Sequence, residues 1–286
     1  MKSKNRSILV TGAKGQLGSE IQDLSASVPS DFEFTDIEEL DITSMDDIRE
    51  FVSSQTFDTV INCAAYTAVD QAEKEEDQAE LINKKAAQNI AVMCCEQKAR
   101  LIHMSTDFVF DGTSHTPYKE TDKPHPVSVY GQTKWAGENA VLKHGDDVVI
   151  VRTSWLYSSY GHNFVKTMLR LTQERESLNV VFDQVGNPTY ARDLAGAVLK
   201  IAHAEKFTTG IYHFSNEGVA SWYDLAQAIV DITGADCQIH PIETYQYPTP
   251  AKRPPYSVLN KAKIKNTYHL QIPHWRESLQ KCLSLL

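Results

Sequence analysis

Short apolar segments alternate with longer amphipathic ones along most of the chain. Between the apolar runs, side chains recur at helical spacing, as in the stretch that follows Lys134. Strands that alternate with helices form a parallel sheet with helices on both faces. The pattern therefore predicts an α/β fold with a doubly wound, Rossmann-type sheet. The runs that predict strands are 7–11, 32–35, 59–61, 101–104, 148–151, 178–182 and 211–214.

The tail of the chain has a different character. A helix is predicted near 222–232, an aperiodic stretch covers 241–255, and a last helix follows Pro273. We expect this tail to form a smaller part that covers the carboxyl ends of the strands. The expected division is a dinucleotide-binding domain of residues 1–155 with a returning segment at about 176–215, and a substrate-binding domain of about 156–175 and 216–286.

Composition and charge limit the classes of partner that the protein can bind. The chain has 286 residues and a net charge of -9, which argues against a nucleic-acid surface because such a surface needs clustered Lys and Arg. The five cysteines include no pair with metal-ligand spacing, so we expect reduced thiols of a cytoplasmic protein and no metal site. The apolar run Ile8–Val10 is too short for a signal peptide, and no segment is long enough to span a membrane.

A glycine turn follows the first predicted strand. Gly12, Gly15 and Gly18 are spaced three and three, with Gln16 and Leu17 opening the next helix. Strand, glycine turn and helix in this order bind a dinucleotide pyrophosphate, because the backbone can approach the phosphates and the helix N-terminus carries free amides. The alternative is a purely structural turn.

The second predicted strand ends at Asp36, where an acidic residue usually binds the adenine ribose hydroxyls. No Lys or Arg lies between residues 21 and 48, and Lys14 is the nearest candidate for a 2'-phosphate. The residues alone thus favour NADH or dual use, although Asp36 could also be a solvated strand end. Asp41 and Ile42 lie on a loop that could cover the adenine.

Small residues follow the third predicted strand. Ala64 and Ala65 come directly after its end and leave room for a ligand that lies across the sheet. We therefore include both among the expected cofactor-binding residues.

A phenol and an ammonium lie four residues apart at Tyr130 and Lys134. On a helix this spacing places both side chains on one face. A positive charge near a phenol lowers its pKa, so the pair predicts a proton donor or acceptor that works near neutral pH. Chance occurrence on a helix is the alternative.

Seven stretches in this order resemble the extended short-chain dehydrogenase/reductase family, over nearly the whole chain. The resemblance is closest to its members that reduce a dTDP-linked 4-keto-6-deoxy sugar. It implies an NAD(P)H-dependent oxidoreductase that uses NADPH or NADH, with a homodimer as one possible state. The stretches are TGAKGQLG, CAAYTAVDQAE, STDFVFDG, YGQTKWAGE, RTSWLY, NPTYARDLA and AKRPPYSVLN.

The resemblance also implies roles for single residues. Thr106 is the hydroxyl member of a catalytic set with Tyr130 and Lys134, and Ser105 is the alternative if the alignment shifts by one. Lys134 would also hold the nicotinamide ribose. Phe108 departs from the family, where Tyr is common.

The expected substrate residues come from other stretches. Arg253 is a candidate clamp for the diphosphate, because a guanidinium can bind phosphate oxygens bidentately, although a surface salt bridge is the alternative. Trp155 would line the sugar pocket unless it only packs in the core. The remaining expected substrate residues are Thr67, Val69, Thr106 and Asp107.

Two other functions stay open. One is a non-catalytic nucleotide-binding subunit, similar to the regulatory subunit of methionine adenosyltransferase, which keeps the fold without the reaction. The other is an epimerase or dehydratase of the same family, which usually carries extra acid-base residues beside the Tyr. Asp107 is the one nearby carboxylate that the sequence offers.

Overall fold

A six-stranded parallel sheet forms the centre of the computed structural model, which describes residues 6–286. The strands lie in the order β10-β5-β4-β3-β1-β2. The chain adds β2 on one side of β1 and then adds β3, β4, β5 and β10 on the other side, as in doubly wound dinucleotide-binding folds. This confirms the predicted fold class. The six strands are β1 (Arg6–Thr11), β2 (Ser30–Thr35), β3 (Thr59–Asn62), β4 (Arg100–Thr106), β5 (Val148–Thr153) and β10 (Gly210–His213).

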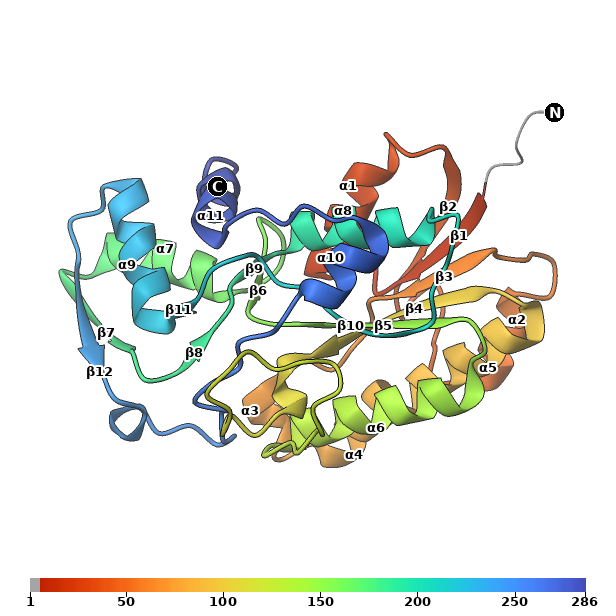
Figure 1. Ribbon diagram of the computed structural model, residues 1–286, viewed down its shortest axis with the longest axis horizontal. Coiled ribbons are helices and arrows are strands. Elements are labelled where there is room, and N and C mark those ends of the chain that lie inside the picture. Colours follow the sequence, from red (N-terminus) through yellow and green to blue (C-terminus); the bar gives the residue numbers. More distant parts are fainter. Residues whose placement is uncertain (1–5) are drawn as a thin grey trace.

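Helices cover both faces of this sheet (Figure 1). The central strands are apolar on both sides because each face is buried under a helical layer. One layer consists of α1 (Gln16–Ser25), α8 (Ala191–Ala202) and α10 (Ala262–Tyr268). The other layer contains α2 (Met45–Phe51), α3 (Val69–Ala72), α4 (Glu76–Glu80), α5 (Ala87–Gln97) and α6 (Val129–His144).

A π-helical segment, Leu81–Ala86, joins α4 to α5 and lies against α6. Its Asn83 binds the backbone of Tyr66 through both amide atoms and donates to Thr133 Oγ1 at 3.1 Å. A Cβ added to Gly137 of α6 would lie 2.1 Å from the carbonyl oxygen of Asn83. The close approach of these two backbones fixes the position of α6.

A second lobe has its own hydrophobic core, which includes Tyr157, Leu225 and Trp275. It lies beyond the carboxyl ends of the central strands (Figure 1). Its elements are β6 (Leu156–Tyr157), α7 (Phe164–Glu174), β7 (Ser177–Val181), β8 (Val185–Gly186), β9 (Thr189–Tyr190), β11 (Ala220–Ser221), α9 (Trp222–Thr233), β12 (Gln238–Ile242) and α11 (Trp275–Leu283).

One predicted strand lies elsewhere than expected. The run at 178–182 was expected to continue the central sheet as part of the returning segment 176–215, but β7 pairs in parallel with β12 in a separate two-stranded sheet. Its residues alternate between buried and exposed, whereas β3 is buried throughout. A strand with one wet face suits the edge of a small lobe and does not suit the middle of a doubly covered sheet.

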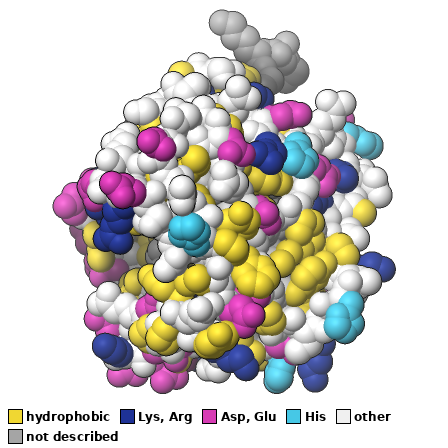
Figure 2. All heavy atoms as spheres, turned by 90° about the vertical axis from the view of Figure 1, so that its left-hand side faces the viewer, with side chains coloured by type: hydrophobic (Ala, Val, Ile, Leu, Met, Phe, Trp, Pro, Cys, Tyr) yellow, Lys and Arg dark blue, Asp and Glu magenta, His cyan; other side chains and the backbone are white. Residues whose placement is uncertain are grey.

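Hydrophobic side chains gather on the outer face of the second lobe (Figure 2). Phe182, Tyr245 and Tyr247 are exposed, and the backbone amide of Phe182 donates to Ile242 at the end of β12. The lobe therefore presents apolar surface outside its own core.

Two helical glycines give opposite predictions for stability. Alanine favours a helix over glycine by about 1 kcal/mol. At Gly137 the new methyl would meet backbone at 2.1 Å, so Gly137→Ala is expected to destabilise the protein by about 1–3 kcal/mol despite that gain. At Gly196 of α8 nothing lies within 4 Å, so Gly196→Ala is the matched control and is expected to stabilise.

Urea denaturation of both variants measures the difference. Equal changes in the free energy of unfolding would contradict the close approach of α6 to the π-helical segment.

Candidate active site

The predicted catalytic set meets at the open end of the central sheet. Thr106 ends β4, and Tyr130 and Lys134 lie one turn apart on α6. All three side chains are buried or nearly so. The hydroxyls of Tyr130 and Thr106 are close enough to interact, and Phe108 packs edge-on against the phenol ring at 5.6 Å.

The start of α6 is fixed by two side chains. Ser128 accepts the amide of Gly131 as an N-cap, and Glu73 accepts the amide of Val129. Any Cβ at Gly131 would lie 2.3 Å from the carbonyl oxygen of Phe108. The helix therefore begins directly against the end of β4, which brings the phenol to Thr106.

A buried ion pair ties α6 to the sheet one turn after Lys134. Arg152 of β5 donates to both carboxylate oxygens of Glu138, at 2.8 and 2.6 Å, and both side chains are 1% exposed. Ser105 donates to the same carboxylate at 2.6 Å. Sequence reasoning assigned no role to Glu138, although it lies one helical turn from Lys134 inside the stretch YGQTKWAGE.

Lys134 is fully enclosed in this structure. Its ammonium donates to the carbonyl oxygen of Met104 at 2.7 Å. Burial lowers the pKa of Lys134 to about 8, against the charge of Glu138, which raises it. A buried cation with a pKa near neutrality is consistent with a group that takes part in chemistry.

The expectation that Lys134 lowers the pKa of Tyr130 is wrong for this state. Burial raises the pKa of Tyr130 to about 12, the hydrogen bond with Thr106 opposes that shift, and the charge of Asp107 adds to it. Lys134, whose ammonium donates to the carbonyl oxygen of Met104, does not contribute to the shift. The phenol is therefore fully protonated at neutral pH and is suited to donate a proton.

Asp107 is a buried carboxyl next to the catalytic set. It accepts the hydroxyl of Thr106 at 3.0 Å and is 1% exposed. Burial raises the pKa of Asp107 to about 6, although the nearby hydroxyls of Ser257 and Thr106 act against that shift. The carboxyl is mostly ionised at neutral pH and helps to keep Tyr130 protonated.

The glycine turn forms a cradle that only a backbone without side chains allows. A Cβ at Gly12 would lie 2.6 Å from the amide of Ala64, and one at Gly18 would lie 2.4 Å from the carbonyl oxygen of Gly12. Gly12 also has a positive φ of 69°. Gly15 precedes the first helical residue of α1 and offers no side-chain cap, so the helix amides can face an anion. These features fit a dinucleotide pyrophosphate.

The end of β2 is acidic. Asp36 accepts the backbone amides of Lys14 and Ile37. The ammonium of Lys14 forms ion pairs with Glu38 and Glu39. The one local cation that the sequence offered for a 2'-phosphate is therefore already paired.

The other expected cofactor residues lie around the same end of the sheet. Ala64 and Ala65 are partly buried beside the glycine turn. The side chain of Asp41 accepts from Thr43 within its own loop, and Ile42 is buried in the core beneath α5.

Two residues of the cofactor turn lie on α1. Gln16 accepts a hydrogen bond from Asn163 at 3.0 Å, and Leu17 is buried against the sheet. Asn163 also caps α7, so the glycine-turn helix contacts the second lobe directly.

Trp155 stacks on Trp222 with ring centroids 3.6 Å apart and planes 6° apart. Its φ of 47° is rare for a bulky residue and costs about 1–3 kcal/mol, a strain that often accompanies a functional position. A Cβ at Gly186 would lie within 2.8 Å of the indole. Trp222, which sequence reasoning did not single out, extends the aromatic surface at the start of α9.

The remaining expected substrate residues come from α3 and its approach. Val69 packs in the hydrophobic cluster that contains Tyr130, and Thr67 is exposed. Arg253 is not free: its guanidinium forms a bidentate ion pair with Asp70, at 3.0 and 2.7 Å. The salt-bridge alternative for Arg253 is therefore observed in this structure.

The chain matches the family model described as RmlD substrate binding domain over residues 6–286. It belongs to this family. Its sequence is 41% identical over 285 residues to the dTDP-4-dehydrorhamnose reductase of Aggregatibacter actinomycetemcomitans, across 96% of this chain and 97% of the relative. It is 39% identical to the dTDP-4-keto-6-deoxy-D-glucose reductase of Streptomyces niveus, across 97% of this chain and 96% of the relative.

A solved structure is also very similar. The dTDP-4-dehydrorhamnose reductase of Bacillus anthracis str. Ames, in complex with NADP, has a TM-score of 0.95 and 39% sequence identity. The match covers 99% of this chain and 100% of that chain. Fold and sequence thus agree over the full length of the described residues.

A polar network that sequence reasoning missed lies beneath the glycine turn of this RmlD-family chain. Thr11 donates to Asn62 at 2.9 Å, and Asn62 contacts His103 at 3.2 Å, each on a neighbouring strand. Asn62 also accepts the amide of Ala64. Burial and the nearby Lys134 lower the pKa of His103, so its ring is neutral. Polar residues in otherwise apolar strands were the available signal.

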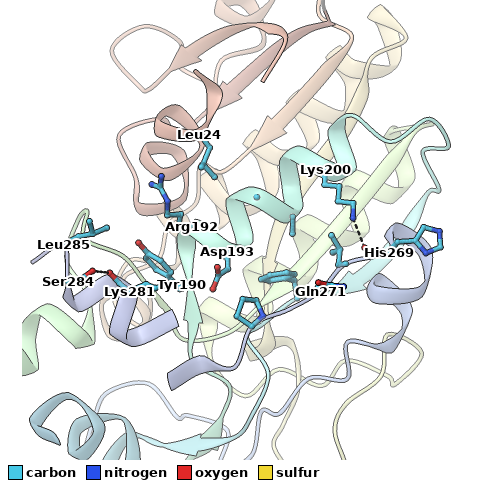
Figure 3. Close-up of a pocket in the computed structure, with 15 residues that line it drawn as sticks. Leu24, Tyr190, Arg192, Asp193, Lys200, His269, Gln271, Lys281, Ser284 and Leu285 are labelled. Carbon is cyan, nitrogen blue, oxygen red and sulfur yellow. Dashed lines mark hydrogen bonds between the residues drawn. The ribbon is translucent and has the colours of Figure 1, made fainter. Parts of the chain in front are cut away.

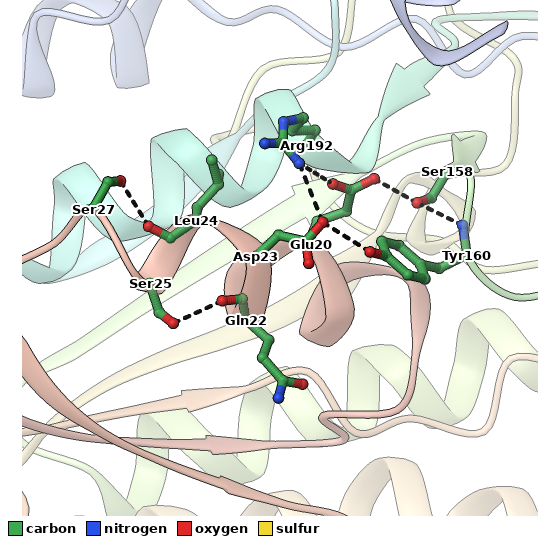
Figure 4. Close-up of polar contacts among 9 residues, drawn as sticks. All are labelled: Glu20, Gln22, Asp23, Leu24, Ser25, Ser27, Ser158, Tyr160 and Arg192. Atoms are coloured by element: carbon green, nitrogen blue, oxygen red, sulfur yellow. Dashed lines mark hydrogen bonds and ion pairs between the residues drawn. The ribbon is translucent and has the colours of Figure 1, made fainter. Parts of the chain in front are cut away.

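A second network joins α1 to the start of α8 (Figure 4). Glu20 is fully buried and accepts from Ser158 at 2.6 Å and from Arg192 at 3.1 Å. Tyr160 donates to Asp23 on the next turn of α1. These contacts hold the loop after β6 against the helix that follows the glycine turn.

One groove lies away from the catalytic set. It has a volume of about 860 Å³ and runs between α8 and the C-terminal segment (Figure 3). Tyr190, Arg192 and Lys200 are among its lining residues, and none of the expected site residues lines it. The groove therefore does not mark the reaction site.

Residues 6–286 offer neither a metal site nor a membrane-spanning helix. No three His, Cys, Asp or Glu side chains group in a way that could hold a metal ion. No helix in that range is long and apolar enough to cross a membrane.

The raised pKa of Asp107 predicts a pH-dependent stability change. The folded state binds this proton more tightly than the unfolded chain, so the carboxyl lowers stability as pH rises from about 4 to about 6. Asp107→Asn keeps an acceptor for Thr106 without the charge. We expect it to exceed the wild type in stability by up to about 3 kcal/mol at pH 7, and by much less near pH 4.

Denaturant titrations across this pH range measure the effect. Asp231→Asn, at a half-exposed position, is the control and should show no such trend. A constant difference between Asp107→Asn and the wild type at all pH values would contradict the buried, ionised carboxylate.

Proposed function

We propose that this protein reduces the C4 ketone of dTDP-4-dehydro-L-rhamnose to give dTDP-L-rhamnose, with NADPH or NADH as the hydride donor. The observation that carries the proposal is the position of Tyr130, Thr106 and Lys134 beside the glycine cradle at one end of the sheet. Relatives about 40% identical over nearly the full chain are named dTDP-4-dehydrorhamnose reductase. That name supports this reaction over a non-catalytic subunit or an epimerase.

The reaction needs a hydride at C4 and a proton on the carbonyl oxygen. A reduced nicotinamide supplies the hydride when it is bound. Tyr130 donates the proton, because its phenol is protonated at neutral pH. Thr106, whose hydroxyl donates to Asp107 in this structure, would turn that proton to the same oxygen as negative charge grows on it.

Lys134 stabilises the phenolate that Tyr130 leaves behind. Its ammonium binds Met104 in the present structure, so we propose that it turns or shares its protons between that carbonyl and the site. We also assign it the nicotinamide ribose. Because its pKa is about 8, the group is still mostly charged at neutral pH.

For the cofactor, we propose Gly12, Gly15, Gln16, Leu17 and Gly18 at the pyrophosphate, and Asp36 at the adenine ribose. The Bacillus anthracis relative is in complex with NADP, which supports use of NADPH. The carboxylates of Glu38 and Glu39 beside Lys14 repel a 2'-phosphate, which supports use of NADH. We therefore keep both cofactors in the proposal. Asp41, Ile42, Ala64 and Ala65 complete the proposed cofactor set.

For the substrate, we propose Arg253 at the diphosphate and Trp155 against the sugar. Val69, at the start of α3, and Thr67, just before α3, would lie on the side of the sugar opposite Trp155. The second lobe with its strand β7 would form most of the substrate-binding part. Asp107 contacts the substrate only through Thr106 in this proposal.

A second candidate is reduction of the epimeric ketone, dTDP-4-keto-6-deoxy-D-glucose. The Streptomyces niveus relative, 39% identical, carries that name. Incubation of the full chain and NADPH with each ketone in turn discriminates the two. We expect one NADPH consumed per dTDP-4-dehydro-L-rhamnose; faster turnover of the other ketone would overturn the first assignment.

Removal of the phenolic hydroxyl tests the proton donor. Tyr130→Phe is expected to lower turnover by at least about 10²-fold, because the proton transfer is lost, with little change in cofactor affinity. Steady-state NADPH oxidation and a cofactor titration measure the two quantities. Tyr245→Phe, at an exposed phenol, is the control. Turnover within a few-fold of wild type would remove Tyr130 from the mechanism.

Removal of the guanidinium tests the diphosphate site. Arg253→Ala is expected to raise the KM for the sugar nucleotide by about 10- to 100-fold, more than it lowers turnover, because charged hydrogen bonds to phosphate are lost. Arg276→Ala removes an exposed arginine that pairs with Asp231 and is the matched control. An unchanged KM would place the diphosphate elsewhere.

A further inference from the structure

The pairing of Arg253 with Asp70 joins two parts of the chain that are 183 residues apart. Asp70 lies on α3, next to Val69, which packs in the cluster around Tyr130. Arg253 lies four residues before Ser257, which is near enough to Asp107 to influence its pKa. The ion pair therefore lies close to the catalytic set and joins α3 to the C-terminal segment.

The contact is end-on. Oδ1 of Asp70 accepts from Nη1 of Arg253 at 3.0 Å, and Oδ2 accepts from Nη2 at 2.7 Å. The other proton of Nη1 is directed to Thr249 Oγ1 and the carbonyl oxygen of Ala251. A guanidinium has five N–H groups. In the described residues, no hydrogen bond uses the N–H of Nε or the second N–H of Nη2. These two N–H groups lie along the same lateral edge of the guanidinium.

That unused lateral edge is a bidentate donor, and it matches two oxygens of a phosphate group. A free arginine side chain would lose rotamer freedom on binding. Here the end-on contact has already removed that freedom. Asp70 also accepts the backbone amide of Ala251 at 3.1 Å, so it orders the loop that carries Arg253.

We infer that Asp70 is a positioning residue for the sugar-nucleotide diphosphate: it holds the Arg253 guanidinium end-on and leaves the lateral edge for the phosphates. The inference rests on the proposed function, in which Arg253 binds the diphosphate. Sequence reasoning gave Asp70 no role.

Charge repulsion between Asp70 and a diphosphate acts in the opposite direction. The Asp70 side chain is 40% exposed, so water and salt screen that repulsion. The hydrogen bonds with Arg253 lower the pKa of Asp70, which keeps the carboxylate ionised at neutral pH. The ordering effect is therefore present at neutral pH, and the inference requires that it outweigh the screened repulsion.

The test is a double-mutant cycle of Asp70→Asn, Arg253→Ala and the pair. We expect Asp70→Asn alone to raise the KM for dTDP-4-dehydro-L-rhamnose by about three- to tenfold, the factor that ordering one long side chain is worth. Turnover should stay within about twofold and the KM for NADPH should not change. In the Arg253→Ala background, Asp70→Asn should have no further effect.

Two results with Asp70→Asn would overturn the inference. An unchanged KM would mean that the carboxylate does not position Arg253, and a lower KM would mean that the carboxylate competes with the diphosphate. The same rise in both backgrounds would mean that Asp70 acts without Arg253. Asp231→Asn, which removes a carboxylate from an exposed ion pair with Arg276, is the matched control and should leave all constants unchanged.

Calorimetric titration with dTDP separates this inference from the proposed function. If the wild type oxidises no NADPH with the ketone but binds dTDP, weaker binding by Asp70→Asn still supports the positioning role. If the wild type binds no dTDP, both ideas fail. If Asp70→Asn does not fold by circular dichroism, Thr249→Val replaces it, with a smaller rise in KM expected and an unchanged KM as the contrary result.

Discussion

The buried ion pair between Glu138 and Arg152 is the contact on which the catalytic arrangement depends. One carboxylate receives Arg152 from β5 and Ser105 from β4, and it lies on α6 one turn after Lys134. A buried pair is weak evidence for net stability, because desolvation offsets most of the attraction. Loss of one partner, however, leaves an uncompensated charge in the core. The pair thus restricts α6 to the position that brings Tyr130 to Thr106.

The same burial decides the chemistry of the site. It raises the pKa of Tyr130 to about 12 and lowers that of Lys134 to about 8. These values suit a reaction in which the phenol donates its proton. The phenol is protonated beforehand, and the ammonium, which is still mostly charged at neutral pH, then lies beside the phenolate. Asp107 contributes to the same balance, because its charge opposes ionisation of the phenol.

Much of this arrangement could be predicted from the sequence. The glycine turn and the pair Tyr130 and Lys134 are local patterns, and their fold context follows from strand and helix periodicity. The seven family-like stretches placed Thr106. The expected strand at 178–182 was correct as a strand but wrong in its sheet, since an apolar run does not say which partner it pairs with.

Long-range pairing was the part that the sequence could not supply. The ion pair of Arg253 joins residues far apart along the chain, and the pKa of Tyr130 depends on its burial in the folded protein. Arg152 is a charge in an otherwise apolar strand, a signal that marks a buried polar contact but does not identify Glu138 as the partner.

Isotope transfer tests the central claim most directly. NADPH that carries deuterium at the transferable C4 position is incubated with the full chain and dTDP-4-dehydro-L-rhamnose, and the product is analysed by NMR. The proposed hydride transfer predicts one deuterium on the sugar C4 and one oxidised cofactor for each product molecule. A product without deuterium, or conversion without net oxidation of the cofactor, would contradict it.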